Sequence, residues 1–163
     1  MMHALVFVAL LGVTQTPASE PAVVSKLVGQ WHGQGVVTGR ASEITMTWER
    51  VIGEAFVRLR FRNAMAAVGG RPAEVFEAHG YYRVTAGATE AATGTWLDGR
   101  GYILPVQVTL SPDTFTSQWG NATTEQGRTV YRLTGPDTLE VVDLVRTAAG
   151  EYREFGRSQL RRQ

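Results

Sequence analysis

Even spacing of turn residues between short alternating segments is the feature that most limits what this chain can fold into. Turn-forming residues such as Gly, Pro, Asp and Asn gather at positions 39–40, 52–54, 69–72, 86–87, 98–101, 111–113, 120–121, 135–137 and 149–150. Between these turns apolar and polar residues alternate, most clearly over 44–49 and 57–62. Alternation with a period of two is typical of a β-strand that buries one face and exposes the other. The sequence therefore predicts about ten short strands joined by turns.

Helices that could connect parallel strands are missing from this pattern. Only residues 21–28 are typical of a helical turn, so neighbouring strands are expected to be antiparallel. A row of hairpins leaves two unpaired edges unless its first and last strands meet. We therefore predict an all-β fold: a closed antiparallel up-and-down β-barrel of about ten strands with a short N-terminal helical turn. A sandwich of two stacked sheets is the alternative, and it predicts longer crossovers than this spacing allows.

Composition excludes several classes of protein and of site. The 163 residues are 44% hydrophobic and 19% charged, with a net charge of +1 and no cysteine. This apolar content is enough for one core and does not match a disordered chain. The charge balance lacks the basic excess of a nucleic-acid-binding protein. Without cysteine there are no disulfides, thiolate zinc sites, iron–sulfur clusters or cysteine nucleophiles.

The N-terminal residues are typical of an export signal. Residues 4–11 form an uncharged apolar run, shorter than the about 20 residues that cross a bilayer. Small residues at Thr16 and Ala18 fit signal-peptidase cleavage before Ser19. We therefore predict a signal peptide over 1–18, a barrel domain over 19–163 without a membrane segment, and a secreted or periplasmic location. A buried N-terminal strand is the alternative.

A motif in the first predicted strand resembles a known group of barrels. Residues 29–35 read Gly-x-Trp-x-Gly-x-Gly, and an arginine-rich final strand follows at 152–162. The Gly-x-Trp opening resembles that of the calycin superfamily, the lipocalins and fatty-acid-binding proteins, and its longer form is similar to nitrobindin-like barrels. The resemblance covers roughly residues 27–162 and points to a loosely defined bacterial branch of calycin-like proteins. It implies the barrel fold and brings little chemistry with it.

The resemblance also implies roles for residues of the first and last strands. It implies that Trp31 plugs one end of the barrel and that Arg157, Arg161 or Arg162 stacks on it as a structural cation–π pair. By similarity to fatty-acid-binding proteins, one arginine of the last strand turns into the cavity to hold a carboxylate, and Arg157 is our choice. Nitrobindin-like proteins ligate haem iron through a histidine near the C-terminus, whereas residues 156–162 contain none.

Large aromatic residues on separate strands are candidates for ligand contact. Trp48, Trp96 and Trp119 each lie on a different predicted strand. Trp96 and Trp119 stand at strand ends, where we expect them to ring one mouth with the indole N–H available to a polar ligand group. A purely structural role in the core is the alternative, although the two roles overlap in a barrel that contains a pocket.

The strand around His79 has two faces of different character. Period two places His79 and Tyr81 on a polar face with Glu77, whereas Phe76 and Tyr82 share the other face. If the polar face points inward, the cavity gains a ladder of hydrogen-bonding groups with one titratable imidazole. If it points outward, the aromatic face forms core, and hydrophobicity favours this second arrangement.

Asp143 interrupts an apolar strand over 141–145 and is expected near the core. A buried carboxylate must be paired or protonated. One interpretation is a structural pair with a neighbouring arginine, Arg132 or Arg153. The other is a cavity acid beside His79, the sequence's one hint of general acid–base catalysis.

Taken together, these observations favour a secreted or periplasmic binding protein for a small, largely apolar ligand held in the barrel cavity. We expect neither a catalytic nor a metal-ligating set, no cofactor, and a small hydrophobic or amphipathic molecule as the partner rather than nucleic acid. The alternatives are an isomerase or hydrolase on the same barrel that uses His79 with a carboxylate, and a haem-binding barrel with His79 as ligand. The candidate ligand-binding residues are Trp48, His79, Tyr81, Trp96, Trp119 and Arg157.

Overall fold

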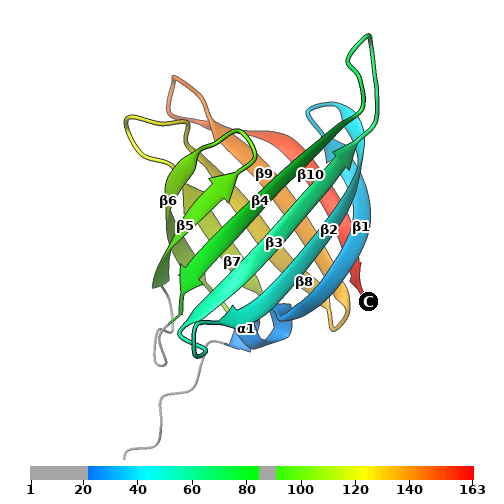
Figure 1. The fold of residues 1–163 in the computed structure, drawn as a ribbon. Helices are drawn as coiled ribbons and strands as arrows, with labels where there is room; N and C mark the ends of the chain where they lie inside the picture. The colour runs from blue at the N-terminus through cyan, green and yellow to red at the C-terminus, as the bar shows by residue number, and fades with distance from the viewer. Residues whose placement is uncertain (1–21, 85–90) are drawn as a thin grey trace, which may run out of the picture.

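A closed ten-strand barrel with one short helix at its end is the architecture of the computed structural model, which describes residues 22–84 and 91–163 (Figure 1). The expected signal peptide and the expected turn at 86–87 lie outside the described residues. The elements in chain order are α1 (Ala22–Leu27), β1 (Gly29–Val37), β2 (Arg40–Val51), β3 (Phe56–Met65), β4 (Glu74–Arg83), β5 (Ala91–Asp98), β6 (Ile103–Leu110), β7 (Thr114–Trp119), β8 (Gly127–Gly135), β9 (Thr138–Arg146) and β10 (Tyr152–Arg162).

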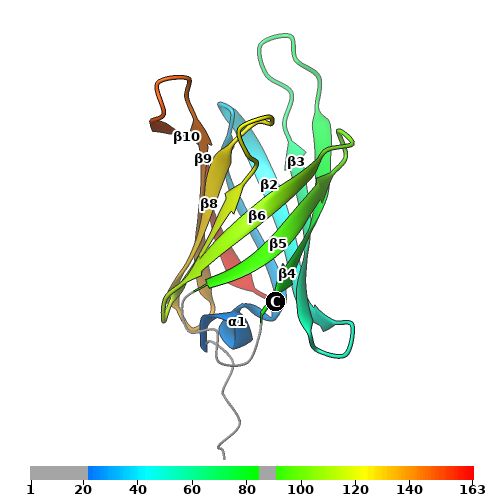
Figure 2. The ribbon, with the colours of Figure 1, turned by 90° about the vertical axis from the view of Figure 1, so that its left-hand side faces the viewer.

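Every strand pairs antiparallel with its neighbours in sequence, and β1 also pairs with β10. This last pairing joins the two edges that an open meander would leave exposed. It aligns Trp31 with Arg162 and Val37 with Gly156. The structure thus confirms the predicted all-β fold, closed and up-and-down, and rules out the sandwich. In Figures 1 and 2, α1 lies across one end of the barrel, while the β3–β4 and β9–β10 loops extend from the other end. We call the second end the mouth.

The glycines of β1 allow this strand to approach β10 very closely. A side chain at Gly33 would lie 2.6 Å from Leu160 Cα and 2.8 Å from the backbone carbon of Gln159. A side chain at Gly35 would lie 2.7 Å from Ser158 Cα. Real Cβ atoms do not tolerate such distances, so both positions require glycine. The Gly-x-Gly part of the motif is therefore explained by the curvature that closes the barrel.

Trp31 and Arg162 close the end of the barrel that α1 covers. Trp31 is fully buried and its Nε1 donates a hydrogen bond to Leu27 O at 2.8 Å. The Arg162 guanidinium lies 4.3 Å from the centroid of the Trp31 ring. The same guanidinium donates hydrogen bonds to Val28 O at 2.8 Å and Lys26 O at 2.5 Å, which binds the last strand to the end of α1. The expected cation–π pair is confirmed, with Arg162 as its arginine.

Buried aromatic side chains fill the α1 half of the barrel. Trp48 stacks on Tyr82 with ring centroids 5.7 Å apart, and it meets Phe115 at 5.2 Å and Tyr131 at 5.1 Å edge to face. All four residues are at most 2% exposed. Gly80 makes room for this packing, because a side chain there would lie 2.6 Å from Tyr82 Cζ. This half of the interior is solid core.

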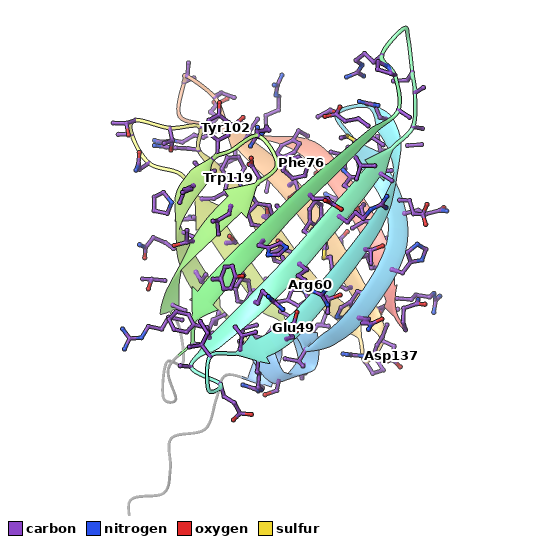
Figure 3. The ribbon with its side chains drawn as sticks, in the orientation of Figure 1. Glu49, Arg60, Phe76, Tyr102, Trp119 and Asp137 are labelled. Carbon is purple, nitrogen blue, oxygen red and sulfur yellow. The ribbon has the colours of Figure 1, made fainter. Side chains whose placement is uncertain are left out.

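Charged side chains pair across the outer face of the sheet. Arg60 Nε lies 3.0 Å from Glu49 Oε1 on the neighbouring strand (Figure 3), and Arg157 lies 2.6 Å from Glu140. Such exposed pairs add at most about 1 kcal/mol each, so they keep the outer face polar more than they stabilise the fold. Among the described residues, no helix is long and apolar enough to span a bilayer.

Candidate functional site

Inward-facing aromatic side chains near the mouth keep contact with solvent. Phe61, Phe76, Trp96 and Trp119 point inward yet remain partly accessible, whereas Trp48 in the other half is 1% exposed. We call these four residues the mouth aromatics. Figure 3 shows Phe76 and Trp119 toward the upper end of the barrel, opposite α1. The interior therefore changes along its axis from a sealed core to aromatic side chains near the mouth that remain partly exposed to solvent.

Three of the mouth aromatics contact one another across neighbouring strands. Phe61 on β3 lies 6.1 Å from Phe76 on β4 and 6.1 Å from Trp96 on β5, measured between ring centroids. The Arg100 guanidinium, from the β5–β6 loop, lies 5.6 Å from the Phe76 centroid at the rim. Edge-to-face and tilted contacts of this kind form a continuous apolar wall.

Trp119 supplies the wall on the other side of the interior. It pairs with Gly127 of β8, and a side chain at Gly127 would collide with the six-membered part of its indole. Glycine at this position therefore lets the indole lie across the sheet. The Trp119 Nε1 donates a hydrogen bond to Thr129 Oγ1 at 3.4 Å. This contact connects the apolar wall to a polar group on β8.

Asp143 is an acidic group of this region that no arginine pairs with among the described residues, unlike Asp98, which lies 2.8 Å from Arg100. Asp143 lies opposite Thr129 of β8 and Gly156 of β10, and its Oδ1 accepts a hydrogen bond from the Thr129 hydroxyl at 2.7 Å. Burial raises the pKa of Asp143 to about 6; Thr129 opposes this rise and the Glu154 charge adds to it. A carboxyl with this pKa is largely ionised at neutral pH and takes up its proton as the pH falls through 6.

The expected partner of Asp143 is not an arginine. No ion pair among the described residues involves Asp143. Arg132 instead lies 3.6 Å from Glu140 on the outer face, and Arg153 is exposed. Strand alternation explains the correction, because Asp143 shares the inward face with Val141 whereas Arg132 points outward.

Other buried polar groups border the same interior. Asn63 on β3 is 3% exposed, and among the described residues its Oδ1 has no hydrogen-bond partner. Ser117 on β7 and Ser158 on β10 are also buried. Deeper in the barrel, burial raises the pKa of both Tyr82 and Tyr131, so both phenols stay protonated. A largely apolar interior with a few polar groups is typical of a small-molecule site.

The six residues expected to bind ligand fall into two groups. Trp96 and Trp119 line the mouth half as expected, and Trp48 is interior but belongs to the sealed core. His79, Tyr81 and Arg157 lie on the outer face, so their choice as ligand-binding residues of the cavity is corrected, whereas the outward orientation that hydrophobicity favours for the His79 face is confirmed. His79 is exposed beside Arg60 and Leu97 in the sheet register.

The outward orientation of this face follows from the burial of its alternate residues. Ala78 and Tyr82, at 3% and 0% exposure, take the inward positions of β4. Tyr81 lies instead beside Arg58, whose pKa it raises together with Glu49. Arg157 donates to Glu154 at 2.7 Å and Glu140 at 2.6 Å, both outside the barrel.

The positions of the histidines bear on the two alternative functions. His79 and Asp143 face opposite sides of the barrel wall, so they do not form the expected interior acid–base pair. His32 also faces outward, where its Nε2 lies 2.8 Å from Glu43 Oε1. Neither histidine of the described residues is therefore placed to ligate a haem inside the barrel.

Two grooves lie on the outer face. One of about 500 Å³ runs over β1 to β4 and is lined mostly by small side chains such as Ala41 and Ala64. Its acidic residues are already paired, Glu43 with His32 and Glu74 with Arg40 at 3.1 Å. The other groove, of about 280 Å³, contains His79, Tyr81, Glu77 and Leu97. Neither groove has the aromatic walls of the interior.

Phe61, Asn63 and Thr129 are site residues that sequence reasoning missed. The alternation of β3 places Phe61 and Asn63 on the same face as Leu59, which was the available signal for both. Thr129 carried no such signal, because its role depends on the register that sets it opposite Asp143.

Comparisons with known proteins show the fold and no family. No family model matches this chain, and no curated protein matches it. The S-type phycobiliprotein lyase CPES from Guillardia theta is 11% identical, with a TM-score of 0.60 over 86% of this chain and 90% of that chain.

Two further solved structures are similar over nearly their whole length. Rv2717c from M. tuberculosis is 17% identical, with a TM-score of 0.64 over 89% of this chain and 99% of that chain. The barrel EF1p2_mFAP2b, solved bound to DFHBI, is 11% identical, with a TM-score of 0.52 over 89% of this chain and 100% of that chain. The chain is thus a closed ten-strand antiparallel barrel similar to barrels that include a phycobiliprotein lyase and a barrel bound to a small molecule.

Proposed function

We propose that this protein binds a small, largely apolar molecule in the mouth half of its barrel. The observation that carries the proposal is the set of four mouth aromatics, which face inward and yet remain accessible. The similar barrel solved with DFHBI and the similar phycobiliprotein lyase support it as precedents for this fold. The Gly-x-Trp resemblance supports a calycin-like barrel, and the apolar run over 4–11 supports export to a secreted or periplasmic location.

Apolar burial supplies the affinity in this proposal. A ligand that covers the mouth aromatics removes their apolar surface from water, at about 25 cal/mol per Å². Ring edges and faces from β3, β4, β5 and β7 present this surface from opposite sides, which favours a flat ligand body between them. The proposed ligand is therefore a small aromatic or polyene molecule with few polar groups.

Binding rather than catalysis is proposed because of where the chemistry-bearing groups lie. His79 would have to act on the outer face, since Ala78 and Tyr82 hold the inward positions of its strand. Asp143 has the Thr129 hydroxyl as its hydrogen-bond donor and, within residues 22–84 and 91–163, no imidazole beside it. This arrangement supports positioning of a bound molecule better than proton transfer between two groups.

Fluorescence titration with N-phenyl-1-naphthylamine, a neutral aromatic probe, tests the proposal. We expect one probe to bind per chain, and we expect Trp119→Ala and Phe76→Ala each to weaken binding at least tenfold because each removes a wall. Tyr81→Ala is the matched control, since it removes a ring of the same strand as Phe76 from the outer face. Circular dichroism and thermal unfolding establish that each variant is folded.

Two outcomes would contradict the proposal. One is the absence of probe binding to the wild-type chain. The other is a loss of affinity in Tyr81→Ala that equals the loss in the two interior variants, which would place the probe on the outer face. Native mass spectrometry of the gently purified protein, compared with its denatured mass, then identifies any molecule carried through purification.

A further inference from the structure

We infer that the ligand of the mouth half carries a positively charged nitrogen, which pairs with Asp143. The inference rests on the proposed function and adds the chemical class of the ligand. It starts from an interior carboxyl that the described residues leave without a cation. Asp143 is half-buried on the inward face, and a carboxylate withdrawn from water is normally compensated by a charged partner, so a missing partner points to one that arrives with the ligand.

The groups around Asp143 come from four elements. Among the described residues, none of these groups is a cation that pairs with the Asp143 carboxylate. On β8, Thr129 donates its hydroxyl and Tyr131 couples to Asp143 electrostatically, while burial raises the pKa of this phenol. On β10, Glu154 adds a negative charge and is itself held outside by Arg157. Arg153, also on β10, is exposed and lies opposite Val145 rather than Asp143. Trp119 of β7 and Val37 of β1 complete the surroundings without charge.

One oxygen of Asp143 remains available for a ligand. Oδ1 accepts the Thr129 hydroxyl, whereas Oδ2 lies 3.1 Å from where a side chain at Gly156 would begin. Glycine at position 156 therefore preserves space beside this oxygen. A carboxylate accepts about four hydrogen bonds, and the structure gives the side chain of Asp143 one from a neighbouring side chain.

The aromatic neighbour of Asp143 favours a cation over a neutral donor. The Trp119 indole is held beside Asp143 through Thr129, at 3.4 Å from its hydroxyl oxygen. An indole face attracts a cation, most strongly where water is excluded. The ligand is therefore a hydrophobic amine or a protonated nitrogen heterocycle, with its apolar body against Phe61 and Trp96. The negative charges of Asp143 and Glu154 would repel an organic anion, which is therefore disfavoured.

Calorimetric titration with three probes that share one ring system tests this inference. The probes are 1-naphthylmethylammonium, neutral 1-naphthylmethanol and anionic 1-naphthylacetate. At pH 7.5 we expect the cation to bind at least tenfold more tightly than the alcohol, and the acetate to bind most weakly. An alkylammonium stays charged over this range, so its affinity should fall as the pH drops through 6 and Asp143 is protonated. The affinity of the alcohol should change little.

Two variants assign the effect to Asp143. Asp143→Asn keeps the shape of the side chain and should bring the cation and the alcohol to within about twofold of each other at pH 7.5. Glu140→Gln is the matched control, because it removes a carboxylate from the same strand but from the outer face. It should preserve the preference for the cation. Thr129→Val removes the hydroxyl that lowers the pKa of Asp143, so the midpoint of the pH dependence should move upward.

The outcomes separate this inference from the function on which it rests. Equal binding of cation and alcohol by the wild-type chain, or an unchanged preference in Asp143→Asn, would overturn the inference while probe binding upholds the proposed function. Tighter binding of the alcohol below pH 6 would also overturn it, because it would mean that protonated Asp143 donates to a neutral ligand. If neither these three probes nor N-phenyl-1-naphthylamine bound to the wild-type chain, the result would contradict the proposed function itself.

Discussion

Asp143 makes the stability of this barrel depend on pH in an unusual direction for a carboxyl. Its pKa rises from 3.8 to about 6 on folding because the inward-facing side chain is partly withdrawn from water. The folded state thus binds the proton more tightly than the unfolded state. The contribution of Asp143 to the free energy of unfolding is complete below pH 4, declines between pH 4 and 6, and is lost above about pH 6. The full change corresponds to about 3 kcal/mol.

Asp143→Asn should therefore stabilise the protein at neutral pH. The amide keeps the polar contact with Thr129 and carries no charge to bury, so the free energy of unfolding at pH 7.5 should rise by up to about 3 kcal/mol. At pH 4, where Asp143 is largely protonated, variant and wild type should agree closely. Urea unfolding at the two pH values measures both differences. A variant less stable than wild type at pH 7.5 would show that the carboxylate is compensated in the free protein.

The sequence predicted the positions of some site residues in the barrel well and those of others poorly. Trp96 and Trp119 could be placed at a mouth because each stands at the end of an alternating segment. For His79, hydrophobicity favoured the outer face, which the structure confirms, although β4 alternates between two faces that are both partly aromatic. Only the packing of Tyr82 against Trp48 decides which face is buried. The partner of Asp143 was unpredictable for a related reason, since it depends on strand register.

At the scale of single elements, β1 is the strand whose sequence is most tightly constrained by its neighbour. We expect Gly33→Ala to destabilise the fold by more than 2 kcal/mol, because the new methyl group would lie 2.6 Å from Leu160 Cα and the backbone would have to move. Gly99→Ala is the matched control, since a methyl group there meets only Glu77 O at an ordinary 3.5 Å. Thermal unfolding compares the two. Equal stability of both variants would contradict the close approach of β1 to β10.

The elements themselves were the most predictable part of the molecule. Turn residues and alternation gave the strands because both signals are local, and the turn after Val37 shows how directly. Thr38 and Gly39 both adopt positive φ, at 51° and 74°, as a two-residue hairpin turn requires. The glycines of β1 were recognisable as a motif, but their cause is contact with a strand far along the chain.

For the whole molecule, Arg162 holds the closed barrel to the helix that covers its end. Arg162→Met keeps the length of the side chain but removes the cation over Trp31 and two donors to backbone oxygens. We expect a loss of about 2–4 kcal/mol, because two backbone carbonyls lose charged donors and the buried Trp31 ring loses its cation. Arg161→Met, on the opposite and exposed side of the same strand, should change the stability by less than about 0.5 kcal/mol. A similar loss in the two variants would contradict the special role of Arg162.

Closure by β1 and β10 also means that the barrel stays open until the last strand has been synthesised. The hydrogen bond from Arg162 to Val28 O spans 134 residues. At about 5–20 residues per second, a ribosome needs roughly 7–27 s to deliver the second partner of β1 after the first residues of that strand have emerged. Throughout this interval the nascent chain is an open sheet whose edge can pair with another copy. The yield of soluble protein in a cell therefore depends on how well that edge is protected before the last strand arrives.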